Sequence, residues 1–259
     1  MTSHPAPTEL ARLVPEEPLW IDLKGLLVSG RCDLLAGSDP AQGFVALSHD
    51  YPFASLFGSP RPEVIRKATA AGLAASSLPH LRSQWQLLAP PESRKLVESA
   101  LPGWRREGIA IHRPGEPVER TATESPAGIL LLPKGHREAG LDLDHVPEES
   151  RYELELEWVS TRPIAVATTV GKAVSFCYAA FRTERFWDVS VETLAPYRRR
   201  GLAAACFLAL AAHMKKSDHM PIWGATLDNP ASLGLAAKLG FERDCTLDGW
   251  SPRERGSRR

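Results

Sequence analysis

The amino-acid sequence predicts an α/β (α+β) protein built from two halves. Strand-like and helix-like segments alternate over residues 43–112, and they alternate again over residues 128–241. The strands are indicated by alternating or short apolar runs, and the helices by longer runs of good helix formers. Residues 114–126 between the halves are polar and proline-bearing, which is typical of a linker.

Composition places the chain among ordinary globular proteins. Of its 259 residues, 43% are hydrophobic and 24% are charged, and the formal net charge is zero. A dedicated nucleic-acid binder usually has a basic balance, so we expect no nucleic-acid partner. The sequence has no apolar run long enough for a membrane span and no signal-peptide pattern at its start. We therefore expect a cytoplasmic protein without a membrane partner.

The four cysteines are scattered and form no C-x-x-C pair. This spacing favours reduced thiols over a disulfide, and we expect no metal site. Cys177 and Cys206 lie in apolar runs, which favours a packing role over a nucleophilic one.

The first half has a strand and helix order of its own. A helix is expected from Trp20 to near Gly30, and Pro62 suits the first turn of another. The remaining predicted elements are a strand at 43–48, a strand at 84–88, a helix at 92–101 and a strand at 108–112.

The second half opens with an apolar strand at Gly128–Leu132 and continues with alternating elements. Gly171 marks a tight hairpin between two of its strands. The predicted elements that follow residue 132 are a helix at 147–158, strands at 164–170, 173–181 and 186–193, a helix at 202–214, a strand at Trp223, a helix from Pro230 to Gly240 and a strand at Phe241.

The segment Tyr197–Ala203 joins a predicted strand to a predicted helix through three arginines and a glycine. A helix N-terminus offers unpaired N–H groups and a partial positive charge, and Gly201 lets an anion approach the backbone. Arginines add charge-assisted hydrogen bonds. The segment therefore predicts a phosphate-binding site. The alternative is an ordinary βα turn with solvated arginines.

This segment resembles the acetyl-CoA pyrophosphate loop of the GNAT superfamily of N-acetyltransferases, Arg/Gln-x-x-Gly-x-Gly/Ala. Arg198, Gly201 and Ala203 fill its fixed places. A second landmark of the family, an Asn followed by a helix that ends Lys-Leu-Gly-Phe, is similar to Asn229–Phe241. The sequence of these segments most resembles a bacterial subgroup of the family whose members carry an additional N-terminal half.

The resemblance implies a central, mostly antiparallel mixed sheet flanked by helices. It assigns residues 126–250 to a GNAT N-acetyltransferase domain, residues 1–115 to an N-terminal α/β domain and residues 251–259 to a basic tail. The N-terminal domain has a similar element order and could be a degenerate copy of the same fold. Its nearest counterpart of the pyrophosphate loop, Gly58–Pro62, has two prolines that lack amide donors.

The resemblance also implies that acetyl-CoA is the cosubstrate. The strand before the loop would hold pantetheine, and the loop and helix start would hold the pyrophosphate. Arg199 and Arg200 could bind the adenosine 3′-phosphate of acetyl-CoA or could simply be solvated. The implied acetyl-CoA residues are Val191, Glu192, Thr193, Arg198, Arg199, Arg200, Gly201, Leu202, Ala203, Ala204, Asn229 and Ser232.

The catalytic residues are less defined. Many family members have a Tyr seven residues after the Asn, and this chain has Ala236 there. Ser232 could supply the acid or simply line the pocket, and Tyr178 and Tyr197 are alternatives. By strand alternation Asp188 and Glu192 share a face, so either could be the base or have only a structural role.

Together these features predict a GNAT-type acyltransferase that moves an acetyl group from acetyl-CoA to a primary amine of a small molecule or peptide. The alternative is a catalytically weak acyl-CoA-binding sensor or interaction module. A homodimer is left open.

Overall fold

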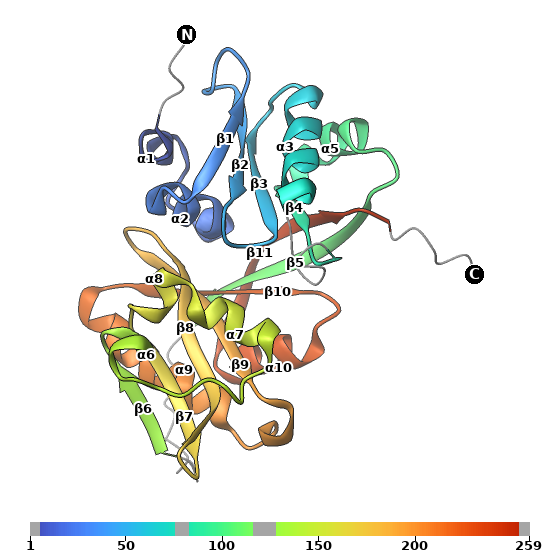
Figure 1. The fold of residues 1–259 in the computed structure, drawn as a ribbon. Coiled ribbons are helices and arrows are strands. Elements are labelled where there is room, and N and C mark those ends of the chain that lie inside the picture. Colours follow the sequence, from blue (N-terminus) through green and yellow to red (C-terminus); the bar gives the residue numbers. More distant parts are fainter. Residues whose placement is uncertain (1–5, 76–82, 116–127, 254–259) are drawn as a thin grey trace. The chain divides into compact units, whose positions relative to one another are not determined.

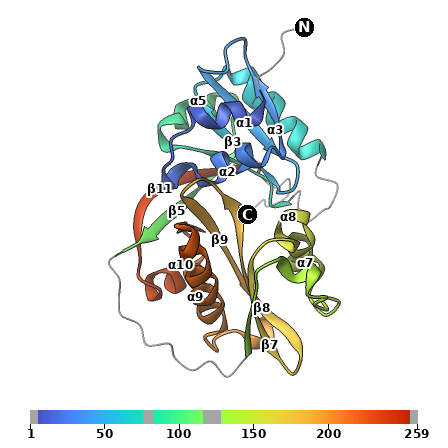
Figure 2. The ribbon, with the colours of Figure 1, turned by 90° about the vertical axis from the view of Figure 1, so that its left-hand side faces the viewer.

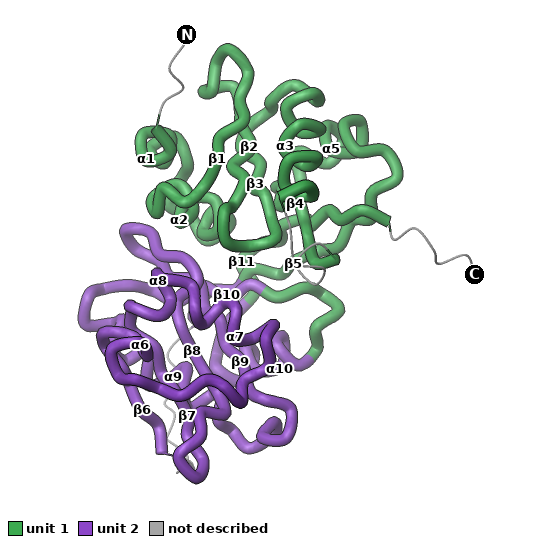
Figure 3. The backbone as a smooth tube through the Cα atoms, in the orientation of Figure 1, with its two compact units in different colours: residues 1–111, 225–230, 243–259 green, residues 112–224, 231–242 purple. Residues whose placement is uncertain are grey.

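The computed structural model describes residues 6–75, 83–115 and 128–253, and the chain folds into two compact units (Figure 1, Figure 3). Unit 1 comprises residues 1–111, 225–230 and 243–259, and unit 2 comprises residues 112–224 and 231–242. Most of the expected linker and of the basic tail lies outside the described residues. The α/β class is confirmed. No helix of the described ranges is long and apolar enough to cross a membrane.

Unit 1 contains strands in the order β1-β2-β3-β4-β11-β5. Strands β1 to β3 are antiparallel, β3 and β4 are parallel, and β4 and β11 are antiparallel. Its elements are α1 (Pro7–Leu10), α2 (Ile21–Ser29), β1 (Cys32–Ala36), β2 (Gly43–Ser48), β3 (Phe53–Gly58), α3 (Pro62–Ala75), β4 (Gln86–Ala89), α5 (Arg94–Ala100), β5 (Arg105–Pro114) and β11 (Phe241–Ser251).

Unit 2 contains strands in the order β6-β7-β8-β9-β10. All neighbours are antiparallel except β9 and β10, which are parallel. Its elements are β6 (Gly128–Leu132), α6 (Gly135–Glu138), α7 (Glu148–Glu155), α8 (Glu157–Ser160), β7 (Ile164–Thr169), β8 (Lys172–Arg182), β9 (Phe186–Thr193), α9 (Leu202–Met214), β10 (Met220–Thr226) and α10 (Pro230–Lys238).

Most predicted elements are present, with several differences. Strands β1 and β3 and the short helices α1 and α6 were not expected from their sequences. The single helix expected at 147–158 is two helices, because Leu156 adopts an extended ψ of 134° between them. The last strand, β11, starts in unit 2 but pairs from Asp248 to Trp250 with β4 of unit 1. The two compact units are therefore not two consecutive stretches of chain separated at residues 115–126, because unit 1 also includes residues 225–230 and 243–259.

The core of unit 2 is an aromatic cluster on one face of its sheet. Trp187 and Trp223 are fully buried and flank Phe207 of α9, with ring centroids 6.1 and 5.8 Å from it. Phe241 lies 5.5 Å from Phe207 and 5.4 Å from Trp223. This cluster fixes α9 on the sheet, which explains why a nearly uncharged helix follows the arginine loop.

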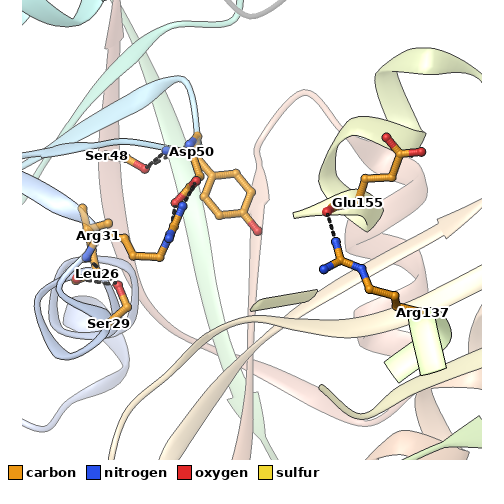
Figure 4. A network of polar contacts seen from close by, with 8 residues as sticks. Leu26, Ser29, Arg31, Ser48, Asp50, Arg137 and Glu155 are labelled. Atoms are coloured by element: carbon orange, nitrogen blue, oxygen red, sulfur yellow. Dashed lines mark hydrogen bonds and ion pairs between the residues drawn. The ribbon is translucent and has the colours of Figure 1, made fainter. Parts of the chain in front are cut away.

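Polar contacts hold parts of each unit that are distant in sequence. In unit 1, the fully buried Asp248 of β11 accepts hydrogen bonds from Arg94 of α5 (Nε 2.6 Å) and Arg106 of β5 (Nη1 3.1 Å). Arg31 forms a similar two-pronged contact with Asp50 at 2.6 and 2.7 Å (Figure 4). Such bidentate contacts are both strong and directional.

In the same close-up, Arg137 of unit 2 donates to the carbonyl of Glu155 at 3.2 Å (Figure 4). Arg137 belongs to α6 and Glu155 ends α7, so the contact links two helices of the connection between β6 and β7.

Two helical glycines provide a matched test of packing. A Cβ on Gly72 of α3 would overlap the indole of the buried Trp85, whereas a Cβ on Gly234 of α10 would meet no atom within 4 Å. We expect Gly72→Ala to lower the free energy of unfolding by about 1–3 kcal/mol. We expect Gly234→Ala to raise it by about 0.5–1 kcal/mol, because alanine is the better helix former. Denaturant titration of both variants measures the two changes, and destabilisation by Gly234→Ala would contradict the packing described for α10.

Candidate functional site

Strands β9 and β10 of unit 2 pair over a short length and then diverge. Their pairing covers three residue pairs, from Phe186 with Met220 to Asp188 with Ile222. On its other edge, β9 continues to pair with β8 as far as Thr193. One edge of β9 beyond Asp188 is therefore not occupied by its neighbour β10.

Backbone groups of β9 face this opening at alternate residues. Leu194 N–H donates to the carbonyl of Val174 in β8 at 2.9 Å. Because strand residues alternate, the N–H and C=O groups of Val191 and Thr193 point away from β8, toward the diverging side. Arg198 Nε donates to the Thr193 carbonyl at 2.9 Å, which supports this orientation.

The loop that follows β9 ends at the N-terminus of α9 with two residues in left-handed conformation. Arg199 has φ 63° and Gly201, the N-cap, has φ 78°. The first N–H groups of a helix have no partner within it, so those of Leu202, Ala203 and Ala204 are available to a ligand. A Cβ on Gly201 would meet no atom within 4 Å, so the space in front of this helix start is open.

The three arginines expected at the loop surround this helix start and are all exposed. Arg198 is held by Thr193, and Arg200 donates to the Pro196 carbonyl at 3.1 Å and lies 5.4 Å from the ring centroid of Tyr197. The three exposed cationic residues immediately precede the first N–H groups of α9 in the chain, and both features favour an anion.

The corresponding turn of unit 1 is closed. Strand β3 also leads through a glycine into a helix, α3, and pairs in parallel with the next strand. Gly58, however, packs against Gly43, and the N–H of Ser59 already donates to the Gln42 carbonyl at 2.8 Å. Pro60 and Pro62 add no N–H groups. Unit 1 has the same connectivity with fewer backbone donors at its turn.

Helices α9 and α7 lie on opposite faces of the unit 2 sheet (Figure 2). On the α7 face, Ser150 Oγ donates to Glu192 Oε1 at 2.5 Å. Tyr178 OH donates to Glu153 Oε2 at 2.6 Å. Residues of one helix thus contact neighbouring strands, β9 and β8, through two short hydrogen bonds.

Glu153 has an unusual environment. Burial raises the pKa of its carboxyl, the hydrogen bond from Tyr178 lowers it, and the nearby charge of Glu192 raises it again, with a net rise above the ordinary value. Two histidines hold this region in place: His136 Nε2 donates to the Leu154 carbonyl at 2.7 Å, and His145 Nε2 donates to the Ala173 carbonyl at 2.6 Å.

The structure separates the two carboxylates that the sequence offered as bases. Glu192 lies beyond the point where β9 and β10 diverge, next to the open edge. Asp188 lies in the last residue pair of the β9–β10 ladder and its negative charge contributes to the raised pKa of Cys177. Only Glu192 is next to the open backbone.

The second landmark forms the predicted strand, turn and helix. Helix α10 begins at Pro230 and its end is marked by Gly240 with φ 81°. Ser232 Oγ accepts a hydrogen bond from the indole N–H of the buried Trp223 at 2.9 Å. Asn229 is exposed and its N–H donates to Thr226, while Ala236 is fully buried. Ser232 therefore has a structural contact whatever else it does.

Sequence reasoning did not identify Ser150 and Glu153. They are three residues apart on a helix, so they share one face and can reach two adjacent strands. That spacing was visible in the sequence, but many surface helices have the same spacing. The signal acquires meaning only when Glu192 and Tyr178 lie opposite.

The four cysteines are free, and three of them are buried. Burial raises the pKa of Cys32, Cys206 and Cys245 to about 12 and that of Cys177 also well above its ordinary value. Only the thiolate reacts readily with disulfide reagents. We expect negligible labelling of the native protein by a disulfide reagent at pH 8, and labelling of all four thiols after denaturation. A thiol that reacts rapidly in the folded protein would contradict this environment.

Residues 165–249, which run from β7 to β11, match a family model described as GNAT acetyltransferase. Among solved structures, the chain is similar to a GCN5-related N-acetyltransferase-like protein from Streptococcus suis 89/1591, with 20% identity, a TM-score of 0.65, and 96% of this chain and 98% of that chain covered. It is also similar to a GCN5-related N-acetyltransferase from Kribbella flavida, with 13% identity, a TM-score of 0.57 and coverage of 98% and 99%.

A GNAT-family acetyltransferase from Colwellia psychrerythraea has 10% identity, a TM-score of 0.56 and coverage of 95% and 94%. At these identities the likeness concerns the fold. No protein of curated function matches the sequence.

Proposed function

Residues 165–249 belong to the GNAT acetyltransferase family, and from this premise we propose that the protein transfers an acetyl group from acetyl-CoA to a primary amine of a small molecule or peptide. The observation that carries the proposal is the divergence of β9 from β10 immediately before the open start of α9. The pantetheine arm of acetyl-CoA carries amide groups that could bond to the free backbone edge of β9, and its pyrophosphate could then bind at the start of α9.

The cosubstrate would lie along this path. Val191 and Thr193 offer backbone groups to pantetheine, and Glu192 lies between them. The N–H groups of Leu202, Ala203 and Ala204, with Gly201, would receive the pyrophosphate, and Arg198, Arg199 and Arg200 would balance its charge. Asn229 and Ser232 remain predicted neighbours of the pantetheine arm.

Glu192 is the proposed base. Its carboxylate is held by Ser150 at 2.5 Å on the face opposite to α9, so an amine approaching from the α7 side meets it before the open edge of β9. General-base removal of a proton from the acceptor contributes about 10²–10⁴ to the rate. Asp188 and Ser232 are weaker candidates, since Asp188 lies within the paired part of β9 and Ser232 supports Trp223.

The alanine at position 236 favours a second candidate function. With no tyrosine at this position, an acyl-CoA-binding sensor or interaction module would need the same phosphate site but no acceptor. Incubation of the purified protein with acetyl-CoA and pooled amines, amino acids and peptides, followed by mass detection of acetylated products, separates the two functions. An acetylated product supports the enzyme, and CoA binding without any product favours the sensor.

Coenzyme A should stabilise the protein against heat. A ligand that binds only the folded state adds about 2.7 kcal/mol at a hundred times its dissociation constant. We expect the melting temperature to rise with CoA concentration and then follow the logarithm of the ligand excess. An unchanged melting temperature at millimolar CoA would refute the assignment of the phosphate site.

Gly201 allows a test of charge at constant shape. Its positive φ of 78° is tolerated by asparagine and aspartate better than by other side chains, and both would enter the open space. We expect Gly201→Asp to weaken CoA binding by at least tenfold more than Gly201→Asn, because only aspartate repels the pyrophosphate. Calorimetric titration with CoA measures both affinities, and equal affinities would show that the phosphates bind elsewhere.

A further inference from the structure

The outer edge of β6 in unit 2 is a row of backbone groups that no described strand uses. β6 is the last strand of the sheet, and it pairs with β7 from Gly128 with Thr168 to Leu132 with Ile164 (Figure 1). A strand has hydrogen-bonding groups on both edges. The edge of β6 away from β7 therefore offers N–H and C=O groups to a further strand, and no strand of the described residues occupies it.

The sequence of β6 does not discourage such pairing. Edge strands are normally protected by charged side chains, proline, β-bulges or a covering segment. β6 reads Gly-Ile-Leu-Leu-Leu, with no charged residue or proline, and its register with β7 has no shift. Strand β1, the end strand of unit 1, differs because it carries Asp33, whose side chain is 72% exposed and lies 3.2 Å (Oδ1 to Nε2) from His49. Of these two end strands, only β6 lacks a charged residue.

The side chains of β6 leave apolar surface on both faces of the sheet. Directly paired residues share a face, and three successive pairs across β6, β7, β8 and β9 connect Leu130 to Glu192. Glu192 contacts Ser150 of α7, so Leu130 lies on the α7 face, where it is 44% exposed. Ile129 and Leu131 alternate to the α9 face and are also partly exposed.

Helix α9 continues the uncharged surface on its own face of the sheet. It packs on β6 as well as on β7, β8 and β9, and it has no Asp, Glu, Lys or Arg between Leu202 and Met214. A helix that is apolar around its whole circumference is normally buried. Leu208 of α9 is nevertheless 41% exposed, and Ala212 is exposed as well. The outer part of α9 thus lacks the charged face expected of a surface helix.

We propose that the outer edge of β6 is the interface of a homodimer, in which β6 pairs antiparallel with β6 of a second copy about a two-fold axis at Leu130. Such an isologous pairing uses the same groups of both copies and removes both free edges. It pairs Gly128 with Leu132 of the second copy and brings the two Leu130 side chains together on the α7 face. The proposal goes beyond the proposed function and does not depend on it.

The symmetry also brings the rest of the uncharged surface to the interface. A specific interface buries about 800 Å² per partner, which is more than five paired residues supply. The two-fold axis of an antiparallel strand pair is perpendicular to the sheet, so α9 of each copy lies on the same face of the joined sheet. Because α9 packs on β6, the flank of each helix extends the interface on that face, while Leu130 extends it on the other.

Sedimentation of the full chain over a range from micromolar to millimolar concentration tests the proposal. We expect wild type to reach twice the monomer mass, and Leu130→Lys to weaken the dimer at least tenfold, because two like charges would meet at the axis. Leu227→Lys is the matched control: Leu227 is 49% exposed in unit 1, so the same substitution should leave the dimer intact. A monomeric wild type at every concentration, or a folded Leu130→Lys protein as dimeric as wild type, would overturn the proposal.

Hydrogen exchange of the wild type, followed residue by residue by NMR, locates the interface without any substitution. The N–H groups of β6 alternate between β7 and the outer edge. We expect those that point to β7 to be protected at all concentrations, and the alternate ones to gain protection as the dimer forms. A dimer in which the outer N–H groups of β6 exchange as fast as in the monomer would place the interface elsewhere and contradict the proposal. This measurement decides the question even if Leu130→Lys fails to fold.

Discussion

The rest of the candidate site depends on the divergence of β9 from β10. A paired strand uses its backbone groups on both edges, so it has none to offer a ligand. Here the ladder stops after Ile222, so β10 does not use the backbone groups of Val191 and Thr193, and the Thr193 carbonyl accepts a hydrogen bond from Arg198 instead. The divergence is stable because β8 continues to hold β9 on its other edge and because the aromatic cluster of Trp187, Phe207 and Trp223 holds α9 beneath it. Every residue except proline offers the same backbone N–H and C=O groups, so this part of the candidate site depends little on which side chains are present.

The two faces of the unit 2 sheet have different tasks in the proposed function. The α9 side presents the helix start, Gly201 and the arginines, all of which favour negative charge. The α7 side presents the carboxylate of Glu192, the proposed base, which accepts a hydrogen bond from Ser150. His136 holds the short helix α7 through its hydrogen bond to the Leu154 carbonyl, and His145 ties the segment before α7 to Ala173 of β8.

Unit 1 contains a similar strand–turn–helix segment whose turn offers fewer free backbone N–H groups. It has antiparallel strands followed by a parallel strand after a crossover helix, as in unit 2. This likeness fits the expectation of a degenerate copy. The Ser59 N–H is used by the Gln42 carbonyl, and Pro60 and Pro62 carry no N–H, so this turn has fewer backbone donors than the start of α9. The buried Asp248 with Arg94 and Arg106 indicates instead that unit 1 is built for packing of β11 against its own strands.

The sequence by itself determined the α/β class, the order of elements in the second half and the strand, arginine loop and helix of the proposed phosphate site. These features are local: alternation, helix starts and glycines in left-handed turns are imposed by neighbouring residues. It did not determine the break of the helix at Leu156, the pairing of β11 with β4, or the meeting of Ser150 with Glu192 and of Glu153 with Tyr178. Those depend on strand register and on the docking of a helix about 25–40 residues away, where many residue spacings fit equally well until the tertiary structure selects one.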